Sequence, residues 1–426
     1  MKDHVGQIAE LLKNGKEVLF YTLGTDTFLS IKELRSRFGL LPTAVCDKDP
    51  KKQGRTWKGL EGVEVISPDE AMERSPEAWW FIPSLNYRYQ ITGYLTEERG
   101  VAADRIINYE PVRRFRSCLH LNRSVQYDRT GELTFSCAKA CPRVLAGERP
   151  DASSLHRLRD GLLKAIEEDR IPPGSLCAGC DLIKEDYYPV APKVLCVNYF
   201  ANSVCNYRCS YCSVAHAGTL KEDVGRHSVD DVIGALRRED MLSEDYDLDF
   251  VTAGEPTLYP GRKEVYRTFD GDKMGFVTNG FLFDEDLFAL MDRKKVYIVT
   301  SIDAGTAETY QQIKGIDGFE RVRRNMKRYA QSSMGIVVLK YILVPGVNDL
   351  PEEIDGFIEF CSETGAAYAI VSLDVYSVSK VTSQTAAAAK RLVSGLEKGN
   401  ILCIPLTANH SEEYASIVRA MMDMEG

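Results

Sequence analysis

The sequence predicts an α/β protein with two parallel-sheet units, an N-terminal doubly wound sheet and a C-terminal partial (β/α)6 barrel. Strand-like and helix-like segments alternate over residues 1–115 and again over 191–426, as they do in parallel sheets covered by helices. At 426 residues the chain is longer than one compact domain usually is. Hydrophobic residues make up 44% and charged residues 27% of it, which describes a folded protein and excludes a disordered one.

Residues 1–115 are expected to form the first unit. An amphipathic helix is expected over 4–13, and a turn containing Gly24 leads from the first strand into a helix that ends near Phe38. Another helix begins near Pro68. The expected strands are 17–21, 43–46, 63–66 and 79–83, and a last helix–strand pair ends at 106–107.

Residues 116–190 have a different pattern, with little sign of strands and one helix expected over 155–169. Prolines interrupt this segment, namely Pro142, Pro150, Pro172, Pro173 and Pro189, with Pro192 just beyond it. Because prolines break regular structure and cysteines recur here, we expect a linker-like segment that holds a cluster.

Residues 191–426 again alternate strand and helix. Six strands are expected at 194–200, 248–252, 275–278, 296–301, 336–344 and 367–372. Helices fall between them, for example 229–238, 284–292, 307–314 and 352–363. Six β/α units indicate a partial barrel, and the chemistry of such barrels lies at the C-terminal ends of the strands.

Charge and cysteine content narrow the class of protein. The net charge of −9 argues against a basic nucleic-acid binder. The first 14 residues carry scattered charge without an apolar core, so no secretory signal is expected, and no apolar run is long enough to cross a membrane. We therefore expect a cytoplasmic protein, in which twelve cysteines favour metal binding over disulfides.

The strongest motif is C-x3-C-x2-C, formed by Cys205, Cys209 and Cys212 in the loop after the first barrel strand. Three thiolates this close in sequence can hold three irons of a cubane 4Fe–4S cluster and leave the fourth iron open. A structural zinc site usually has four protein ligands. The alternatives are a zinc site completed by His216 and buried cysteines without metal.

Three further segments strengthen this interpretation. The second barrel strand ends in TAGEP (252–256), the third in TNG (278–280) and the fourth in SID (301–303). Together with the cysteine loop, they resemble the motifs of the radical S-adenosylmethionine (radical SAM) superfamily, in the right order on the right elements. Ala253 replaces the first glycine of the family's GGEP motif. The resemblance covers roughly residues 193–375.

The resemblance implies a reaction and a set of contacts. A reduced cluster would chelate SAM at its open iron and cleave a C–S bond, and the 5′-deoxyadenosyl radical would remove hydrogen from a substrate in a site that excludes water. We expect an electron donor such as flavodoxin or ferredoxin. Cofactor contacts are expected from Tyr211, which would pack on the adenine, and from Gly254, Glu255, Asn279, Ser301 and Asp303.

A second group of cysteines precedes the barrel. Cys137 and Cys141, followed by Cys177 and Cys180, form two close pairs that can make a four-thiolate site. The segment resembles the SPASM or twitch auxiliary-cluster segments of radical SAM enzymes, although those normally follow the barrel. We expect an auxiliary 4Fe–4S cluster, with a structural zinc site and unmetallated thiols as alternatives. The other cysteines are Cys46, Cys118, Cys196, Cys361 and Cys403, and we expect Cys46, Cys196 and Cys403 to be core residues.

The N-terminal unit resembles a Rossmann-like nucleotide-binding module. Gly24 lies in its first turn, and Asp47 ends the second strand where a ribose-binding carboxylate belongs. Only one glycine of the G-x-G-x-x-G pattern is present. The unit is therefore either a docking or dimerisation module, or a holder of a nucleotide-linked or phosphorylated substrate.

The leading functional hypothesis is a radical SAM oxidoreductase that abstracts hydrogen from a carbohydrate-like or nucleotide-linked small molecule. An auxiliary cluster that accepts an electron would give net dehydrogenation, and epimerisation is the other expected outcome. The alternative substrate is a peptide or protein side chain. A third hypothesis, an iron–sulfur scaffold without catalysis, is disfavoured by Gly254 and Glu255.

Overall fold

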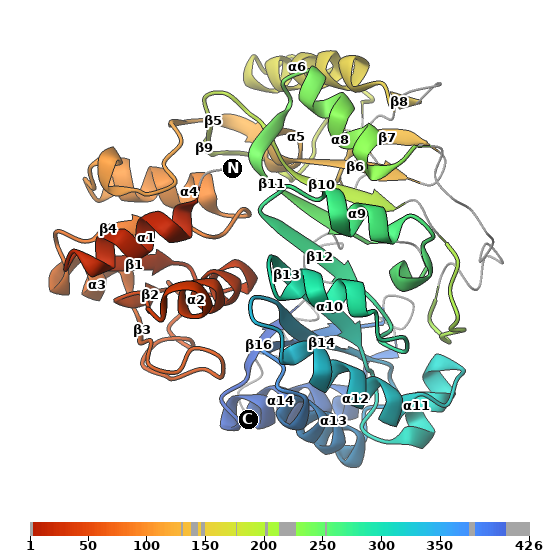
Figure 1. Cartoon of the computed structure of the whole chain (residues 1–426). Coiled ribbons are helices and arrows are strands. Elements are labelled where there is room, and N and C mark those ends of the chain that lie inside the picture. The colour runs from red at the N-terminus through yellow and green to blue at the C-terminus, as the bar shows by residue number, and fades with distance from the viewer. Residues whose placement is uncertain are drawn as a thin grey trace.

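The computed structural model folds the chain into an N-terminal unit and a larger sheet covered by helices (Figure 1). It describes residues 3–128, 131–137, 144–145, 150–175, 177–200, 203–212, 227–251, 254–374 and 380–405. Within these residues there are sheets of four, ten and two strands. The predicted α/β class is confirmed.

The N-terminal sheet has the order β3-β2-β1-β4, with parallel neighbours throughout. Its strands are β1 (Val18–Tyr21), β2 (Ala44–Cys46), β3 (Val65–Ile66) and β4 (Trp79–Phe81). One face is covered by α1 (His4–Lys13) and α2 (Thr25–Phe38), the other by α3 (Pro68–Arg74) and α4 (Arg88–Gly93). Burial on both faces explains why every residue of β1 is buried. The strand order matches half of a doubly wound sheet.

The ten-stranded sheet runs β16-β15-β14-β13-β12-β11-β10-β6-β7-β8. Its strands after residue 190 are β10 (Val194–Phe200), β11 (Leu242–Phe250), β12 (Lys273–Val277), β13 (Lys295–Ser301), β14 (Ile336–Leu343), β15 (Tyr368–Leu373) and β16 (Leu402–Pro405). The six predicted strands are present and parallel in chain order. Only β16 was missed, because a short run that ends in proline gives a weak strand signal.

The helices of this unit lie along one face of the sheet (Figure 1). They are α8 (Val229–Arg238), α9 (Arg262–Thr268), α10 (Glu285–Met291), α11 (Ala307–Lys314), α12 (Phe319–Ala330), α13 (Pro351–Thr364) and α14 (Ser383–Lys398). Residues alternate between the two faces of each strand. In β14, Tyr341 packs on Phe357 of α13 with ring centroids 4.7 Å apart, whereas Val338 faces the opposite, inner side. Among the described residues, no helix has the length and apolarity that crossing a membrane requires.

The expectation of few strands in 116–190 was wrong. Strands β6 (Ser124–Asp128), β7 (Glu132–Phe135) and β8 (Val144–Leu145) extend the large sheet, and β5 (Val112–Cys118) pairs with β9 (Ile183–Pro189). Helices α5 (Leu119–Arg123) and α6 (Ala152–Glu167) accompany them. The strand signal was hidden because β5 reads VRRFRSC, in which the arginines are exposed, so it lacks the apolar alternation of a half-buried strand.

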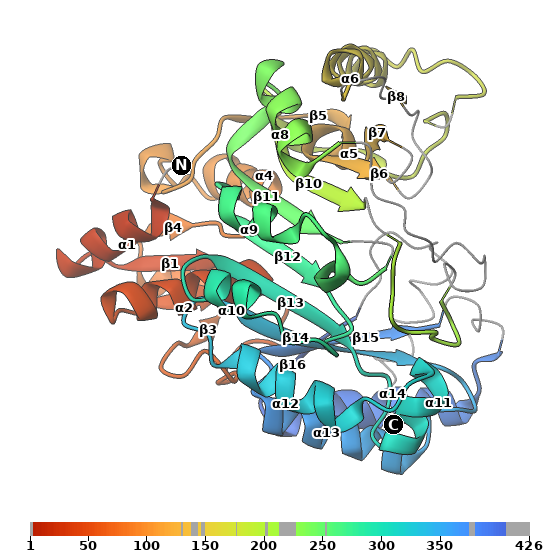
Figure 2. The same cartoon turned by 45° about the vertical axis from the view of Figure 1, so that its right-hand side comes forward.

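The N-terminal unit covers the inner side of the large sheet at the beginning of its strands. Phe28 of α2 stacks on Tyr368 of β15 with ring centroids 5.7 Å apart, and Val299 and Val338 share a buried cluster with α2. In Figure 2 the arrowheads of β10 to β13 point away from this unit. The C-terminal ends of the strands therefore face the opposite way, where a barrel carries its chemistry.

Candidate active site

The predicted motifs meet at one edge of the large sheet. Cys205, Cys209 and Cys212 follow β10, Gly254 follows β11, and Asn279 follows β12. Because β10 to β13 are parallel neighbours in chain order, these segments lie side by side at the C-terminal ends of the strands. The three cysteines are half-buried.

The cysteine loop is held on three sides by hydrogen bonds. The N–H of Glu255 donates to the carbonyl of Val204 at 2.7 Å, and the Asn279 amide donates to Asn206 Oδ1 at 2.7 Å. On the third side, the N–H of Ser210 donates to the carbonyl of Ile313 at the end of α11 at 2.8 Å. The loop is therefore fixed before any cofactor binds.

Gly254 is required by the close approach of this loop. A Cβ atom at Gly254 would overlap the carbonyl oxygen of Val204 and the backbone of Ser203. Any side chain at this position would push the second strand's end away from the cysteine loop. The glycine of the TAGEP motif therefore has a steric role, and Thr252 and Ala253 of that motif lie outside the described residues.

Glu255 joins the ends of two strands. Its buried carboxylate accepts hydrogen bonds from the N–H and hydroxyl of Thr257 (3.1 and 2.7 Å), from Thr278 Oγ1 (2.6 Å) and from the N–H of Asn279 (2.7 Å). Burial raises the pKa of Glu255, and these donors counteract the rise. Three of these donors reach Oε1 and one reaches Oε2, so the side chain orients the strand ends.

Tyr211, Asp303 and Lys314 form a buried polar group beside the cysteine loop. Asp303 Oδ2 accepts from the Tyr211 hydroxyl and from Lys314 Nζ, each at 2.5 Å, and Lys314 Nζ also donates to the Tyr211 hydroxyl at 2.7 Å. The side chain of Asp303 is fully buried and that of Lys314 is 3% exposed. Burial raises the pKa of Tyr211 well above its usual range. Sequence reasoning named Tyr211 and Asp303 but missed Lys314, which lies 11 residues further along the chain.

The inner face of the sheet next to this edge carries a second lysine that the sequence did not single out. Lys340 of β14 lies opposite Ser301 of β13 and Ile370 of β15 in the strand register. Burial lowers the pKa of Lys340, and the nearby charge of Asp303 partly offsets this. Val277 of β12 also faces inward and is 40% exposed.

A polar group lies deeper on the same inner face. The Tyr297 hydroxyl donates to Asp249 Oδ1 at 2.6 Å, and Cys196 Sγ lies 3.6 Å from Asp249 Oδ2. The prediction that Cys196 is a core residue was wrong. It faces inward on β10, where alternate residues are half-buried, because an apolar run in a parallel strand does not reveal which residues line the inner side.

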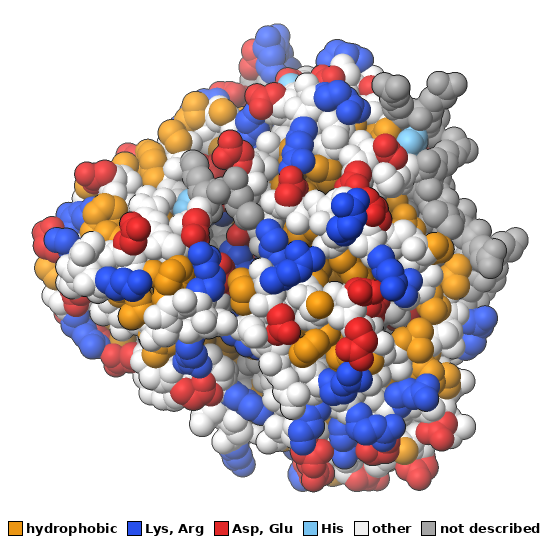
Figure 3. Space-filling view, in the orientation of Figure 1, with side chains coloured by type: hydrophobic (Ala, Val, Ile, Leu, Met, Phe, Trp, Pro, Cys, Tyr) orange, Lys and Arg blue, Asp and Glu red, His pale blue; other side chains and the backbone are white. Residues whose placement is uncertain are grey.

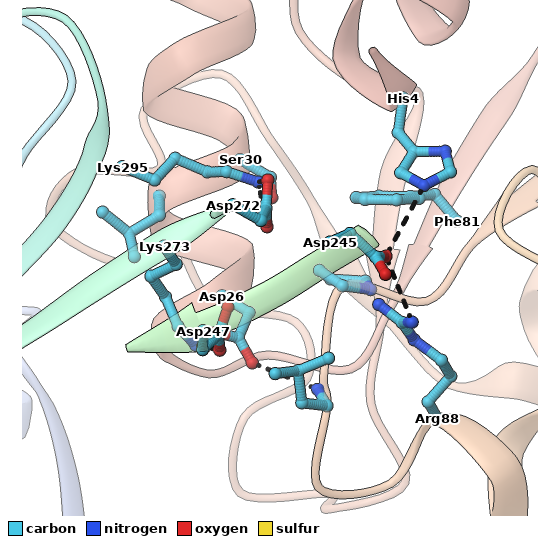
Figure 4. A pocket seen from close by; sticks show the side chains of 13 residues that line it. His4, Asp26, Ser30, Phe81, Arg88, Asp245, Asp247, Asp272, Lys273 and Lys295 are labelled. Atoms are coloured by element: carbon cyan, nitrogen blue, oxygen red, sulfur yellow. Dashed lines mark hydrogen bonds and ion pairs between the residues drawn. The ribbon is translucent and has the colours of Figure 1, made fainter. Parts of the chain in front are cut away.

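Ion pairs join the N-terminal unit to strands β11 and β12 of the large sheet. Figure 4 shows Lys273 of β12 between Asp26 of α2 and Asp247 of β11. Arg88 of α4 pairs with Asp245 at 3.3 Å. Burial raises the pKa of Asp245, but the hydrogen bond with His4 and the charge of Arg88 hold it well below its usual range.

These contacts favour the docking interpretation of the N-terminal unit. The first turn of α2, where a nucleotide phosphate would bind, uses Thr25 to contact Tyr368 and Asp26 to bind Lys273. Asp47 accepts hydrogen bonds from the N–H of Leu23 at 2.9 Å and from Lys52 at 3.0 Å. The side chains of Thr25, Asp26 and Asp47 therefore take part in contacts within the chain.

The second cysteine group lies on the opposite side of β10 from β11. Burial raises the pKa of Cys177, and the thiols of Cys180 and Cys137 lie near enough to raise it further. Cys141 lies outside the described residues. In the described part of the chain, no three His, Cys, Asp or Glu side chains converge on a point where a single metal ion would bind.

The cysteine loop fits a cubane cluster. Each cysteine of such a cluster binds a different iron, so its thiols need not converge on a single point. The N–H of Tyr207 donates to Cys205 Sγ at 3.4 Å, and hydrogen bonds to ligand sulfurs are typical of iron–sulfur sites. Burial raises the pKa of Cys205 to about 11, because a buried thiolate is less stable than the neutral thiol.

Charge on the outer surface is mixed. In Figure 3, basic and acidic side chains are interspersed over the face that is drawn. On α12, Arg323 pairs with Glu363 and Arg328 pairs with Glu285. These two arginines are therefore paired with acidic side chains.

Known proteins resemble this chain over the barrel. The Radical SAM superfamily matches residues 201–361. A GTP 3′,8-cyclase of Chlorobaculum tepidum is 28% identical over 171 residues, which cover 39% of this chain and 50% of that protein. A UPF0026 protein of Helicobacter pylori is 27% identical over 153 residues, or 34% of this chain and 50% of that protein. The chain thus spans about half the length of the curated relatives it matches.

Weak similarity extends to solved structures. Streptococcus suis SuiB bound to the precursor peptide SuiA matches with a TM-score of 0.41 and 13% identity, over 71% of this chain and 74% of that one. The family uses a 4Fe–4S cluster and SAM, and the cysteine loop lies within the matched residues. Residues 201–361 of this chain are therefore a radical SAM domain.

Proposed function

We propose that this protein is a radical SAM enzyme that abstracts hydrogen from a carbohydrate-like or nucleotide-linked small molecule. The observation that carries the proposal is the fixed arrangement of Cys205, Cys209 and Cys212 against Gly254 and Asn279 at the ends of three parallel strands. When bound, the cluster and SAM supply reductive cleavage of a C–S bond and a 5′-deoxyadenosyl radical that abstracts hydrogen.

The chain's own residues would position these groups. Cys205, Cys209 and Cys212 would hold three irons and leave one open to SAM. The backbone at Gly254 is the cofactor-binding part of that motif, because the Glu255 carboxylate is already used by protein donors. Asp303 and Lys314 keep the Tyr211 hydroxyl in place beside the loop.

The substrate would occupy the inner side of the sheet. The N-terminal unit closes this side at the beginning of the strands through Phe28 and Asp26, so a substrate would enter from the strand ends. Lys340, Ser301 and Asn279 would face it there. A small molecule with a negatively charged group would fit beside Lys340 better than an uncharged molecule would.

The auxiliary cluster would accept an electron from the substrate radical. Cys137, Cys177 and Cys180 are close together, and Cys141 is the predicted fourth ligand. Electron acceptance would give net dehydrogenation, whereas a site without this cluster would favour epimerisation. An electron donor such as flavodoxin or ferredoxin is the proposed protein partner, and free cysteines support a reducing, cytoplasmic compartment.

A nucleotide substrate is supported by the name of a relative. The Chlorobaculum tepidum protein is named a GTP 3′,8-cyclase, and it is 28% identical to this chain over 171 residues. GTP combines a sugar, a base and phosphates, which is the class that the inner lysine would recognise.

Product analysis tests the proposal. The anaerobically purified, reduced protein should convert SAM to 5′-deoxyadenosine and methionine, and Cys209→Ala should abolish this conversion while Cys46→Ala, a buried cysteine of the N-terminal unit, should not. Deuterium from a labelled sugar nucleotide should then appear in 5′-deoxyadenosine. Transfer from a labelled peptide instead would show that the substrate class is wrong. Unchanged SAM cleavage in Cys209→Ala would refute the enzyme itself.

A further inference from the structure

We propose that Cys118 is a ligand of the auxiliary cluster, in one set with Cys137, Cys177 and Cys180. The inference rests on the auxiliary cluster of the proposed function and adds a residue that the cysteine spacing did not assign. Cys118 lies 19 positions before Cys137 in the sequence, so it belongs to neither close pair.

Strand pairing brings Cys118 to the second cysteine pair. Cys118 is the last residue of β5 and lies opposite Ile183, the first residue of β9. The N–H of Ile183 donates to the carbonyl of Cys180 at 3.2 Å, and the N–H of Cys180 donates to the carbonyl of Cys177 at 3.2 Å. The turn that carries both cysteines therefore ends beside Cys118.

A second set of contacts brings Cys118 to Cys137. Helix α5 connects Cys118 to β6, and β6 pairs with β7 so that Val125 lies opposite Phe135. The N–H of Cys137 donates to the carbonyl of Phe135 at 2.7 Å, which places Cys137 at the end of β7. Cys137 also packs against the buried cluster that contains Cys118.

Cys118 is buried close to thiols from two other segments of the chain. Burial raises the pKa of Cys118 to about 11, while the backbone N–H groups of Leu121 and His120 act in the opposite direction. The thiols of Cys137 and Cys180 are close enough to raise it further. Backbone N–H groups directed at a sulfur stabilise its negative charge, and Cys205 in the SAM-cluster loop has the same feature.

Other buried cysteines differ from Cys118. Burial raises the pKa of Cys46, Cys361 and Cys403, and the remaining influences on them are side-chain charges. Cys118 combines donors to its sulfur with neighbouring thiols from two other segments. A cubane is the metal group proposed here, because each of its cysteine ligands binds a different iron.

Iron analysis tests this ligand without any activity measurement. The background is the full chain with Cys205, Cys209 and Cys212 changed to Ala, which removes the SAM cluster and should leave about four irons per chain. Adding Cys118→Ala should reduce this to less than about one, as adding Cys180→Ala should. Adding Cys46→Ala, the buried control, should leave the iron content unchanged.

The outcomes separate the two proposals. A background chain without iron would refute the auxiliary cluster and this inference together. Full iron in the background with Cys118→Ala would overturn the inference alone, and loss of iron with Cys141→Ala instead would identify the other fourth ligand. If circular dichroism shows that the Cys118→Ala variant is unfolded, Cys118→Ser in the same background is tested in its place. An EPR spectrum of its reduced cluster that is identical to the spectrum of the background chain would overturn the assignment.

Discussion

The buried ion pair between Asp303 and Lys314 gives a prediction that follows from the structure in detail. Both side chains are almost completely excluded from solvent, and Asp303 also accepts hydrogen bonds from Tyr211 at 2.5 Å and from the N–H of Ile342 at 2.7 Å. Lys314→Met removes the cation and leaves a buried carboxylate with these two donors. Asp303→Asn instead leaves the ammonium buried against a neutral amide.

The expected cost follows from what each change leaves unpaired. Breaking a buried ion pair from one side costs about 3–5 kcal/mol. The two remaining donors on Asp303 place Lys314→Met near about 3 kcal/mol, and Asp303→Asn should cost about 4 kcal/mol. The double variant leaves no unpaired charge, so it should be less destabilising than the sum of the single variants by about 2–3 kcal/mol.

Urea denaturation followed by circular dichroism measures these free energies of unfolding. The matched control is the ion pair of Asp355 and Arg391, in which both side chains are about half exposed. Asp355→Asn should cost no more than about 1 kcal/mol. The reasoning is refuted if Lys314→Met costs as little as this control, or if the double variant equals the sum of the two single variants.

Three further predictions concern other parts of the molecule. Gly254→Ala should lower the iron content of the SAM cluster, because the added Cβ would overlap the Val204 carbonyl. The control is Gly234→Ala on α8, which should leave the iron content unchanged, because its Cβ would only reach the end of the Arg238 side chain at 3.4 Å. Equal iron contents in the two variants would contradict the steric role of Gly254. Burial lowers the pKa of Lys32 to about 8, and the unfolded chain, with a lysine pKa of about 10.4, binds more protons between these values. The stability of the native chain should therefore rise with pH across this window by up to about 3 kcal/mol relative to Lys32→Met, and parallel stability profiles would refute this. Phe28→Ala, which removes the ring stacked on Tyr368, should cost about 3–5 kcal/mol and speed proteolysis between the units; an unchanged cleavage rate would show that the stack does not hold them.

The sequence was sufficient for the elements with strong periodicity and for the short motifs. Apolar runs such as Val194–Phe200 predicted strands of the large sheet correctly, and parallel order alone then places Gly254, Asn279 and Asp303 at one edge. These predictions succeed because strand ends and loop motifs are local properties. The SAM contacts expected from Tyr211 and Ser301 stay predictions.

Other features depend on contacts that are distant in sequence. Lys314 and Lys340 belong to the site only because α11 and β14 bring them beside Asp303. Cys196 and Cys118 were misjudged or left unassigned because their environments are made by β11 and β9, which follow much later in the chain. The sequence of α2 does not reveal that this helix packs on β15. An apolar face on α2 would be expected in any case, because the helix also packs on the N-terminal sheet.

The central claim is that Cys205, Cys209 and Cys212 hold a cluster with one iron open to SAM. The most direct test is the EPR spectrum of the reduced protein in which Cys118, Cys137, Cys177 and Cys180 are changed to Ala, so that only the loop cluster remains. We predict a spectrum of a reduced 4Fe–4S cluster that changes when SAM is added. A spectrum that SAM leaves unchanged, or a protein with zinc in place of iron, would contradict the account.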